Sequence, residues 1–378
     1  MGPLLKTIGW GLYCTCSWTW CIGMWLPLLL IERWGWPGFW LFAIPNVLGC
    51  AAMGYIVRSA AASAALVQQH RGAMRWFSCV TIAFQLYWIT AIACTLGFDA
   101  FIPSSAAMVL VPTVVLGLAL LVACLPLVGW LIAATALFAW TMTSFGLVGT
   151  QFMAQIPDRG SVPPVELWGA APIIVIGFLL SPYLDLTFHR ARRETPSRHA
   201  FAVFGITFMA VLLFVTSYWT VGSWTDGVLG IVLLFWLLQV IFTIGAHLRE
   251  LAATNAPGSG RWGPAHVLVV LAAIPVPLVW IAHRLGASQS SLLDDTYLRF
   301  LGFYGLAVPI WVLAFMWPGQ AERSRRIGIV LIGVLTATFV LAELGMVGSP
   351  TWWLLPAAGL AIAVPIVLGR NSPDAITR

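Results

Sequence analysis

The sequence predicts an all-α polytopic membrane protein with about twelve transmembrane helices. Of its 378 residues, 60% are hydrophobic and only 8% are charged, and the mean hydropathy is +0.93. Soluble domains carry about 25% charged residues, so this chain is not a soluble domain. Its net charge of +6 comes mainly from arginines in short loops between apolar segments. These arginines indicate membrane topology, and we expect no nucleic-acid partner.

About 20 apolar residues cross the hydrocarbon core of a bilayer, and this length divides the chain into its predicted spans. The first span lacks a small-residue cleavage site, so we expect a retained helix rather than a signal peptide. The predicted spans are 8–31, 39–58, 76–97, 105–124, 126–148, 168–189, 201–223, 226–248, 264–284, 297–317, 327–347 and 351–369.

The distribution of basic residues agrees with this division. With the N-terminus inside, only four of the 19 Lys and Arg residues lie outside: Arg33, Arg159, Arg284 and Arg299. Cytoplasmic loops of membrane proteins carry an excess of Lys and Arg. The bias predicts an even number of spans and two cytoplasmic termini, and we expect a bacterial inner membrane.

The first span contains glycines and Pro27 among tryptophans, and Trp18-Thr19-Trp20-Cys21-Ile22-Gly23 forms its centre. Small and polar residues at mid-membrane let a helix unwind or let another backbone approach closely. Close helix packing alone would explain the same residues. The second span has Pro45-Asn46 in its middle, where Asn46 has a neighbouring helix, a freed carbonyl or a ligand as its partner.

The third span places Gln85, Tyr87 and Trp88 at its centre. A mid-membrane glutamine needs a polar partner, so Gln85 should face the protein interior. Both an interhelical hydrogen bond and a ligand would satisfy it. The preceding loop, 59–76, is predicted to be cytoplasmic and to form a short surface helix.

The fourth and fifth spans form a tight hairpin with Pro126 at the bend. The outside loop 149–167 contains the turn signal Pro157-Asp158-Arg159-Gly160. Either a partial lid or an ordinary solvated loop fits this segment.

The sixth span is interrupted where a plain membrane helix should not be. Gly177 and Ser181-Pro182 weaken helical hydrogen bonding, and Asp185 follows immediately. A carboxylate at the bilayer centre costs about 2.5–3.5 kcal/mol. Asp185 therefore has either a functional role or an interfacial position, paired with His189 or Arg190 one turn away.

In the remaining spans, Gln239 and Thr243 are polar residues of the eighth, and Glu343 lies near the outer end of the eleventh, where we expect an interfacial position. The seven cysteines lack zinc-ligand spacing. The histidines lie in loops or close to span ends, which disfavours haem in an electron-transfer subunit. We find no phosphate loop or nucleophile motif, and we expect no cofactor, no metal and no enzyme activity.

Three segments carry a likeness to a known group of proteins: CTCSWTWCIGMWLP in the first span, GFWLFAIPNVLGCAAMGY in the second and GFLLSPYLDLTFHRA in the sixth. Together with the two irregular spans five apart, they resemble the amino acid–polyamine–cation superfamily, which has the leucine-transporter fold. The chain is also distantly similar to sodium:solute symporters. The resemblance implies a first repeat over 1–148, an inverted second repeat over 168–317 and two extra helices over 327–369.

The resemblance also implies a central substrate site where broken parts of the first and sixth spans meet the third and eighth. A sodium site of that fold would need paired hydroxyls on the eighth span, where this chain offers only Thr243. The implied substrate-binding residues are Thr19, Trp20, Cys21, Gly23, Gln85, Tyr87, Gly177, Ser181 and Asp185, with Thr243 as the implied ion ligand.

The function expected from these features is secondary transport of a small polar solute across the lipid bilayer, with Asp185 carrying a proton or balancing charge. The alternative is a non-transporting scaffold subunit that packs against other membrane proteins. The abundance of tryptophan agrees with both functions, because interfacial belts also contain it.

Overall fold

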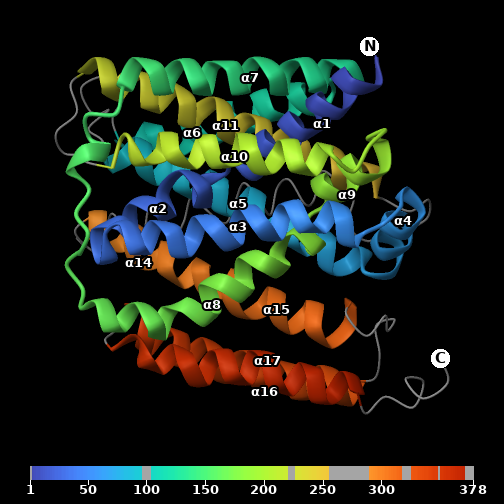
Figure 1. Ribbon diagram of the computed structural model, residues 1–378, viewed down its shortest axis with the longest axis vertical. Helices are drawn as coiled ribbons and strands as arrows, with labels where there is room; N and C mark the ends of the chain where they lie inside the picture. Colours follow the sequence, from blue (N-terminus) through green and yellow to red (C-terminus); the bar gives the residue numbers. More distant parts are fainter. Residues whose placement is uncertain are drawn as a thin grey trace. The chain divides into compact units, whose positions relative to one another are not determined.

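The computed structural model describes residues 2–95, 104–219, 226–254, 289–316, 325–347 and 350–370. All the regular structure in these ranges is helical (Figure 1). This confirms the predicted fold class, an all-α polytopic membrane protein.

Nine helical segments in the described part of the chain are long and apolar enough to cross a membrane, and a bent helix pair raises the number to ten. The bent pair is α1 and α2, which count together as one segment. Helix α10 is apolar but shorter than the nine segments. The helices concerned are α1 (Pro3–Trp18), α2 (Cys21–Trp34), α3 (Trp36–Ile56), α5 (Arg71–Thr95), α6 (Ser104–Ala123), α7 (Leu127–Val148), α8 (Leu167–Leu180), α10 (Ala200–Thr216), α11 (Asp226–Ala253), α14 (Gln289–Gly302) with α15 (Val308–Trp311), α16 (Arg325–Ala342) and α17 (Leu354–Arg370).

These helices correspond to eleven of the predicted spans, and the remaining predicted span, 264–284, lies outside the described residues. Several boundaries differ from the prediction by five residues or more, and α14 begins eight residues before the predicted start of the tenth span. The helix of the seventh span ends at Thr216, whereas α11 continues to Ala253, past the predicted end of the eighth span. The predicted surface helix of loop 59–76 is α4 (Ala60–Gln69), which begins where the Ser59 side chain accepts a hydrogen bond from the Ala62 N–H.

The chain forms two compact units, each assembled from separate segments. Unit 1 comprises residues 1–28, 72–155 and 186–294, and unit 2 comprises 29–71, 156–185 and 295–378. Each unit draws residues from both halves of the predicted repeat pair. The inverted repeat itself stays a prediction.

Within unit 1, α1 packs against α7 and α10, and α11 packs against α6 and α7 (Figure 1). Aromatic rings fill part of the space between these helices. Tyr13 meets Trp130 edge to face at 5.7 Å and Phe242 at 6.0 Å between ring centroids. Edge-to-face pairs stabilise a core by about 0.5–1.5 kcal/mol beyond their buried area.

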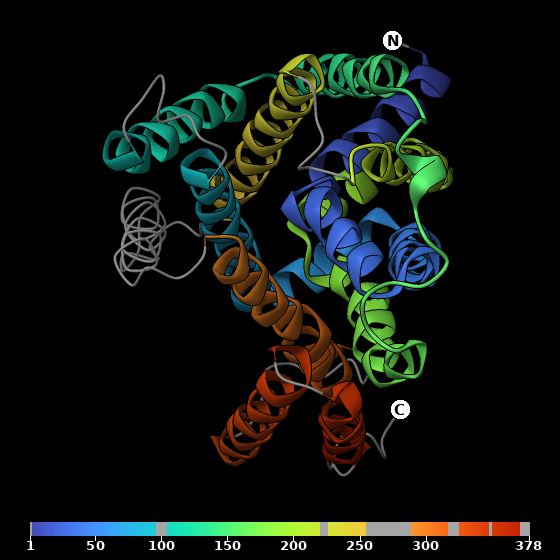
Figure 2. The same cartoon turned by 90° about the vertical axis from the view of Figure 1, so that its left-hand side faces the viewer.

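Within unit 2, α3 packs against α8, and α16 packs against α17. Helices α16 and α17 are drawn in red in Figures 1 and 2. The segment Pro157–Ser161 of loop 149–167 is fixed to the end of α2 rather than free. The Trp36 N–H donates to the Pro157 carbonyl at 3.1 Å, and the Ser161 N–H donates to the Glu32 carbonyl at 2.9 Å. Gly35, with φ of 66°, lies so close to Pro157 that no side chain fits there.

Several membrane helices of unit 2 contain irregular turns that the sequence did not predict. The turns Phe303–Ala307, Val312–Met316 and Glu343–Val347 are π-helical, so their hydrogen bonds span five residues instead of four. Glu343 begins one of them and binds Arg299, with 2.7 Å between Oε1 and the guanidinium. Both side chains are about half exposed.

Candidate functional site

The first predicted span is broken at its centre. Helix α1 ends at Trp18, α2 begins at Cys21, and the pair is bent by 61°. Thr19, between them, has a non-helical ψ of 73°. The unwinding expected from the small and polar residues at 18–23 therefore occurs, and close packing alone does not describe this span.

Side chains from other helices satisfy backbone groups that the break leaves without helical partners. The Thr243 hydroxyl of α11 donates to the Cys16 carbonyl at 3.2 Å. The Cys21 N–H donates to Oε1 of Gln85, on α5, at 3.2 Å. Since unpaired backbone groups are costly in lipid, Thr243 and Gln85 stabilise the broken form of the span.

Gln85 has a second polar atom that these contacts do not use. Its side chain is fully buried, and Nε2 has no hydrogen-bond partner among the described residues. The amide thus presents an open donor beside the first residue of α2. The N-terminus of a helix carries a partial positive charge and free N–H groups, so this position favours a ligand atom that accepts hydrogen bonds.

Tryptophan rings form a cluster along the first turns of α2. Trp25, Trp88 and Trp236 contact one another edge to face, with centroids 5.1–6.3 Å apart. Trp236 also donates through Nε1 to the Tyr218 hydroxyl at 3.3 Å. That hydroxyl in turn donates to the Met24 carbonyl at 3.1 Å. The cluster covers one side of the first turns of α2 with indole rings.

Four other predicted site residues of unit 1 lie in or next to the break, and a fifth, Tyr87, lies on α5. Thr19, Trp20 and Cys21 are buried, and the Thr19 hydroxyl donates to the Thr15 carbonyl at 2.7 Å. Gly23 lies in the first turn of α2, where an added Cβ would be 3.8 Å from Phe208. Tyr87 is buried and stacks on Phe84 at 5.9 Å between centroids.

The sixth predicted span is also interrupted, as the sequence predicted. Helix α8 ends at Leu180, a 3-10 turn covers Ser181–Leu184, and Asp185 has an extended backbone with ψ of 113°. The Ser181 hydroxyl donates to the Gly177 carbonyl, and Asp185 is 1% exposed. Both a functional role of Asp185 and its pairing with His189 or Arg190 stay predictions.

Gly177, Ser181 and Asp185 belong to unit 2, whereas Thr19, Trp20, Cys21, Gly23, Gln85, Tyr87 and Thr243 belong to unit 1. Within unit 1, Gln85 and Thr243 are brought to the break of the first span. Within unit 2, Gly177 and Ser181 are joined by their hydrogen bond. The meeting of the two sets at one site stays a prediction.

Beyond the interruption, the chain continues as α9 (Leu186–Glu194) in unit 1, which carries an ion-pair cluster that the sequence analysis missed. Arg190 Nε lies 2.8 Å from Glu250 Oε1, and an Arg193 nitrogen lies 3.7 Å from Glu250 Oε2. Burial lowers the pKa of Arg190, but the Glu250 carboxylate and the hydrogen bonds to Glu250 and Glu194 raise it above its usual value. Burial also lowers the pKa of Arg193, and the Glu250 carboxylate offsets only part of this decrease. The signal in the sequence was a lone carboxylate at the end of a long apolar helix.

In the described ranges, no group of three His, Cys, Asp or Glu side chains is arranged to hold a metal ion. The described site is instead built from helix ends, one amide, hydroxyls and indole rings. Such groups bind by hydrogen bonding and shape, which suits recognition of a small solute.

Comparison with known proteins gives a structural likeness but no sequence match. No protein family model and no curated protein sequence matches the chain. A solved structure of a Na+-coupled sialic acid symporter, in a substrate-bound outward-open state, matches with a TM-score of 0.53 and 14% identity. The match covers 96% of this chain and 89% of the symporter chain. This chain therefore has a fold like that of a known symporter.

Proposed function

We propose that the chain is a secondary transporter that binds a small polar solute at the break between α1 and α2. Transporters of this architecture bind their substrates at interrupted helices near the bilayer midplane, where half-helix ends meet the ligand. The proposal places the protein in the bacterial inner membrane with both termini cytoplasmic.

The observation that carries the proposal is the open donor of Gln85. Its amide binds the Cys21 N–H through one atom and leaves Nε2 without a partner among the described residues, although the side chain is fully buried. A buried donor that lacks a partner costs about 1–3 kcal/mol. A solute with a carboxylate or carbonyl oxygen would remove that cost and would also interact with the positive end of α2.

Solute-induced thermal stabilisation of the purified protein tests this function. We expect one member of a small library of polar solutes to raise the Tm of the wild-type protein. In Gln85→Leu, the affinity for that solute should fall by about tenfold or more, because one buried hydrogen bond is lost.

The matched control is Thr90→Val, one turn later on α5, where the hydroxyl bonds only the Leu86 carbonyl of its own helix. Its affinity for the solute should stay at the wild-type value. No stabilisation by any solute, together with a stably co-purifying membrane protein, would refute the transporter and favour the scaffold subunit.

A further inference from the structure

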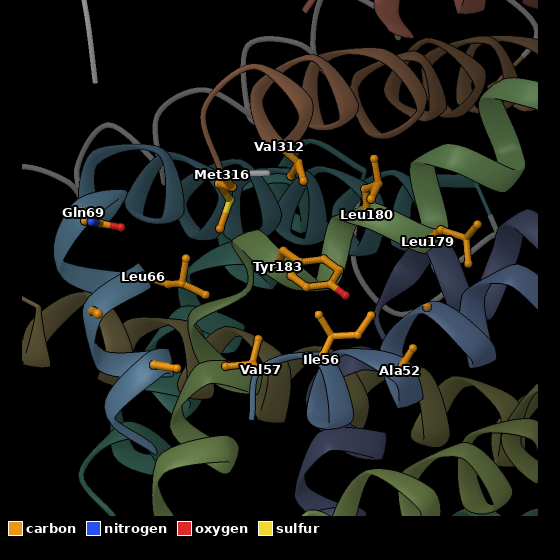
Figure 3. Close-up of a pocket in the computed structure, with 13 residues that line it drawn as sticks. Ala52, Ile56, Val57, Leu66, Gln69, Leu179, Leu180, Tyr183, Val312 and Met316 are labelled. Carbon is orange, nitrogen blue, oxygen red and sulfur yellow. The ribbon is translucent and has the colours of Figure 1, made fainter. Parts of the chain in front are cut away.

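Unit 2 contains a pocket that none of the site residues uses. Its volume is about 590 Å³, within the range of about 300–1,000 Å³ that is typical of ligand sites. Figure 3 shows the Tyr183 ring in the middle, with Ile56 and Val57 on one side and Val312 and Met316 on the other. The lining comes from α3, α4, the end of α8 with its 3-10 turn, and the π-helical turn at 312–316.

The lining is almost entirely aliphatic. Apart from the Tyr183 hydroxyl, only Gln69 contributes a polar side chain group. A polar solute would gain no hydrogen bonds along most of these walls, so the pocket suits a hydrocarbon chain.

A row of apolar side chains on α3 leads into this pocket. Residues 40, 44, 48, 52 and 56 follow one another at intervals of four, so neighbouring members of the row lie one above another while the row winds slowly around α3. Trp40, Ile44, Leu48 and Ile56 are 40–62% exposed. In an integral membrane protein, an exposed apolar row of this kind faces lipid chains, so the pocket continues a lipid-facing surface.

Positive charge flanks the same pocket. Arg58 follows the lining residue Val57 directly, and Arg71 lies two residues beyond the lining residue Gln69. Both arginines are exposed. They are at opposite ends of α4, the short helix that forms one wall. Basic residues beside membrane helices attract anionic lipids by about 1 kcal/mol for each Lys or Arg.

We propose that this pocket binds one acyl chain of a phospholipid with a negatively charged headgroup, whose phosphate lies near Arg58 at one end of α4. The lipid comes from the bilayer in which the chain resides. Because Leu179 and Leu180 end α8 and Tyr183 lies in the 3-10 turn that follows, a bound chain packs against the turn that precedes Asp185.

Native mass spectrometry of the purified full-length protein, titrated with dioleoyl phosphatidylglycerol or dioleoyl phosphatidylcholine, tests the proposal. We expect tighter binding of the anionic lipid. Ala65→Phe, which adds a ring to the pocket wall, should abolish specific binding of both lipids. Ala64→Phe, on the same helix but outside the lining, should bind as the wild type does.

The exposed variant Arg58→Gln tests the headgroup contact without risk to the core. It should weaken phosphatidylglycerol binding about fivefold and leave phosphatidylcholine binding unchanged. Equal affinities of the wild type for the two lipids, or equal binding by Ala65→Phe and Ala64→Phe, would overturn the proposal. A lipid-free dimer that Ala65→Phe dissociates would also overturn it, in favour of contact between two copies.

Discussion

The single side chain of Glu250 contributes to the stability of unit 1. Its carboxylate is fully buried, and it is held by Arg190 and Arg193 from α9. A buried charge is tolerated only when it is paired. Removal of one partner typically costs about 3–5 kcal/mol, which is similar to the cost of creating a large cavity in the core. The pair therefore fixes α9 against α11.

We expect Arg190→Gln to lower the Tm of the purified protein by several degrees, because it removes the closest partner of the buried Glu250 charge. Differential scanning fluorimetry in detergent measures the change. Arg299→Gln is the matched control, since its pair with Glu343 is about half exposed and worth only about 0–1 kcal/mol. Equal decreases of Tm in the two variants would show that the buried ion pair stabilises the protein no more than the exposed pair does.

At the scale of single elements, the packing of α8 depends on a close helix approach. A Cβ added at Gly177 would lie 2.7 Å from the Cα of Gly305, in the neighbouring π-helical turn. Neither atom belongs to a flexible side chain, so the backbones themselves would have to separate. Small residues at such positions let membrane helices pack closely.

Gly177→Ala should therefore destabilise the protein by about 1–3 kcal/mol, the usual cost of overpacking a core. Gly359→Ala, in α17 of the same unit, is the control because an added Cβ there meets nothing within 4 Å. Helix propensity predicts a gain of up to about 1 kcal/mol for the control. Thermal unfolding of both variants measures the difference, and stabilisation by both would contradict the close approach.

The sequence predicted the helices and their interruptions better than the contacts between them. Ser181-Pro182 ends α8 through local chemistry, because proline lacks an N–H, and the interruption is where we expected it. The break at Thr19 was also expected. Its stabilisation by Gln85 and Thr243 was not, because these residues lie 64 and 227 positions from the groups they bind. The pocket beside Tyr183 likewise depends on the packing of four separate segments, which no local pattern records.

At the scale of the whole molecule, a symporter-like fold and a buried carboxylate together bear on which ion is coupled to solute transport. The resemblance to known transporters implies paired hydroxyls for sodium, and the eighth span offers only Thr243. Asp185 is buried and lies directly after the helix interruption. We propose that Asp185 carries a proton during transport.

Solute uptake into proteoliposomes should then follow an imposed pH gradient and persist when sodium is replaced by choline. Asp185→Asn keeps the shape of the side chain but cannot release a proton near neutral pH. It should lose accumulation against a gradient by at least about tenfold, because the proton no longer accompanies the solute. Uptake that needs sodium, or that is unchanged in Asp185→Asn, would contradict the proton role.

The interleaved division of the chain has a consequence for biosynthesis. Unit 1 uses residues up to 294, and unit 2 needs the final 84 residues, 295–378, to be complete. During translation, the early part of unit 2, α3 and α8, therefore enters the bilayer long before its late partners α16 and α17 have been made. We infer that nascent chains truncated before residue 295 leave the face of α8 that packs against α17 uncovered, although α3 is already present, which makes them targets for membrane chaperones and quality-control proteases.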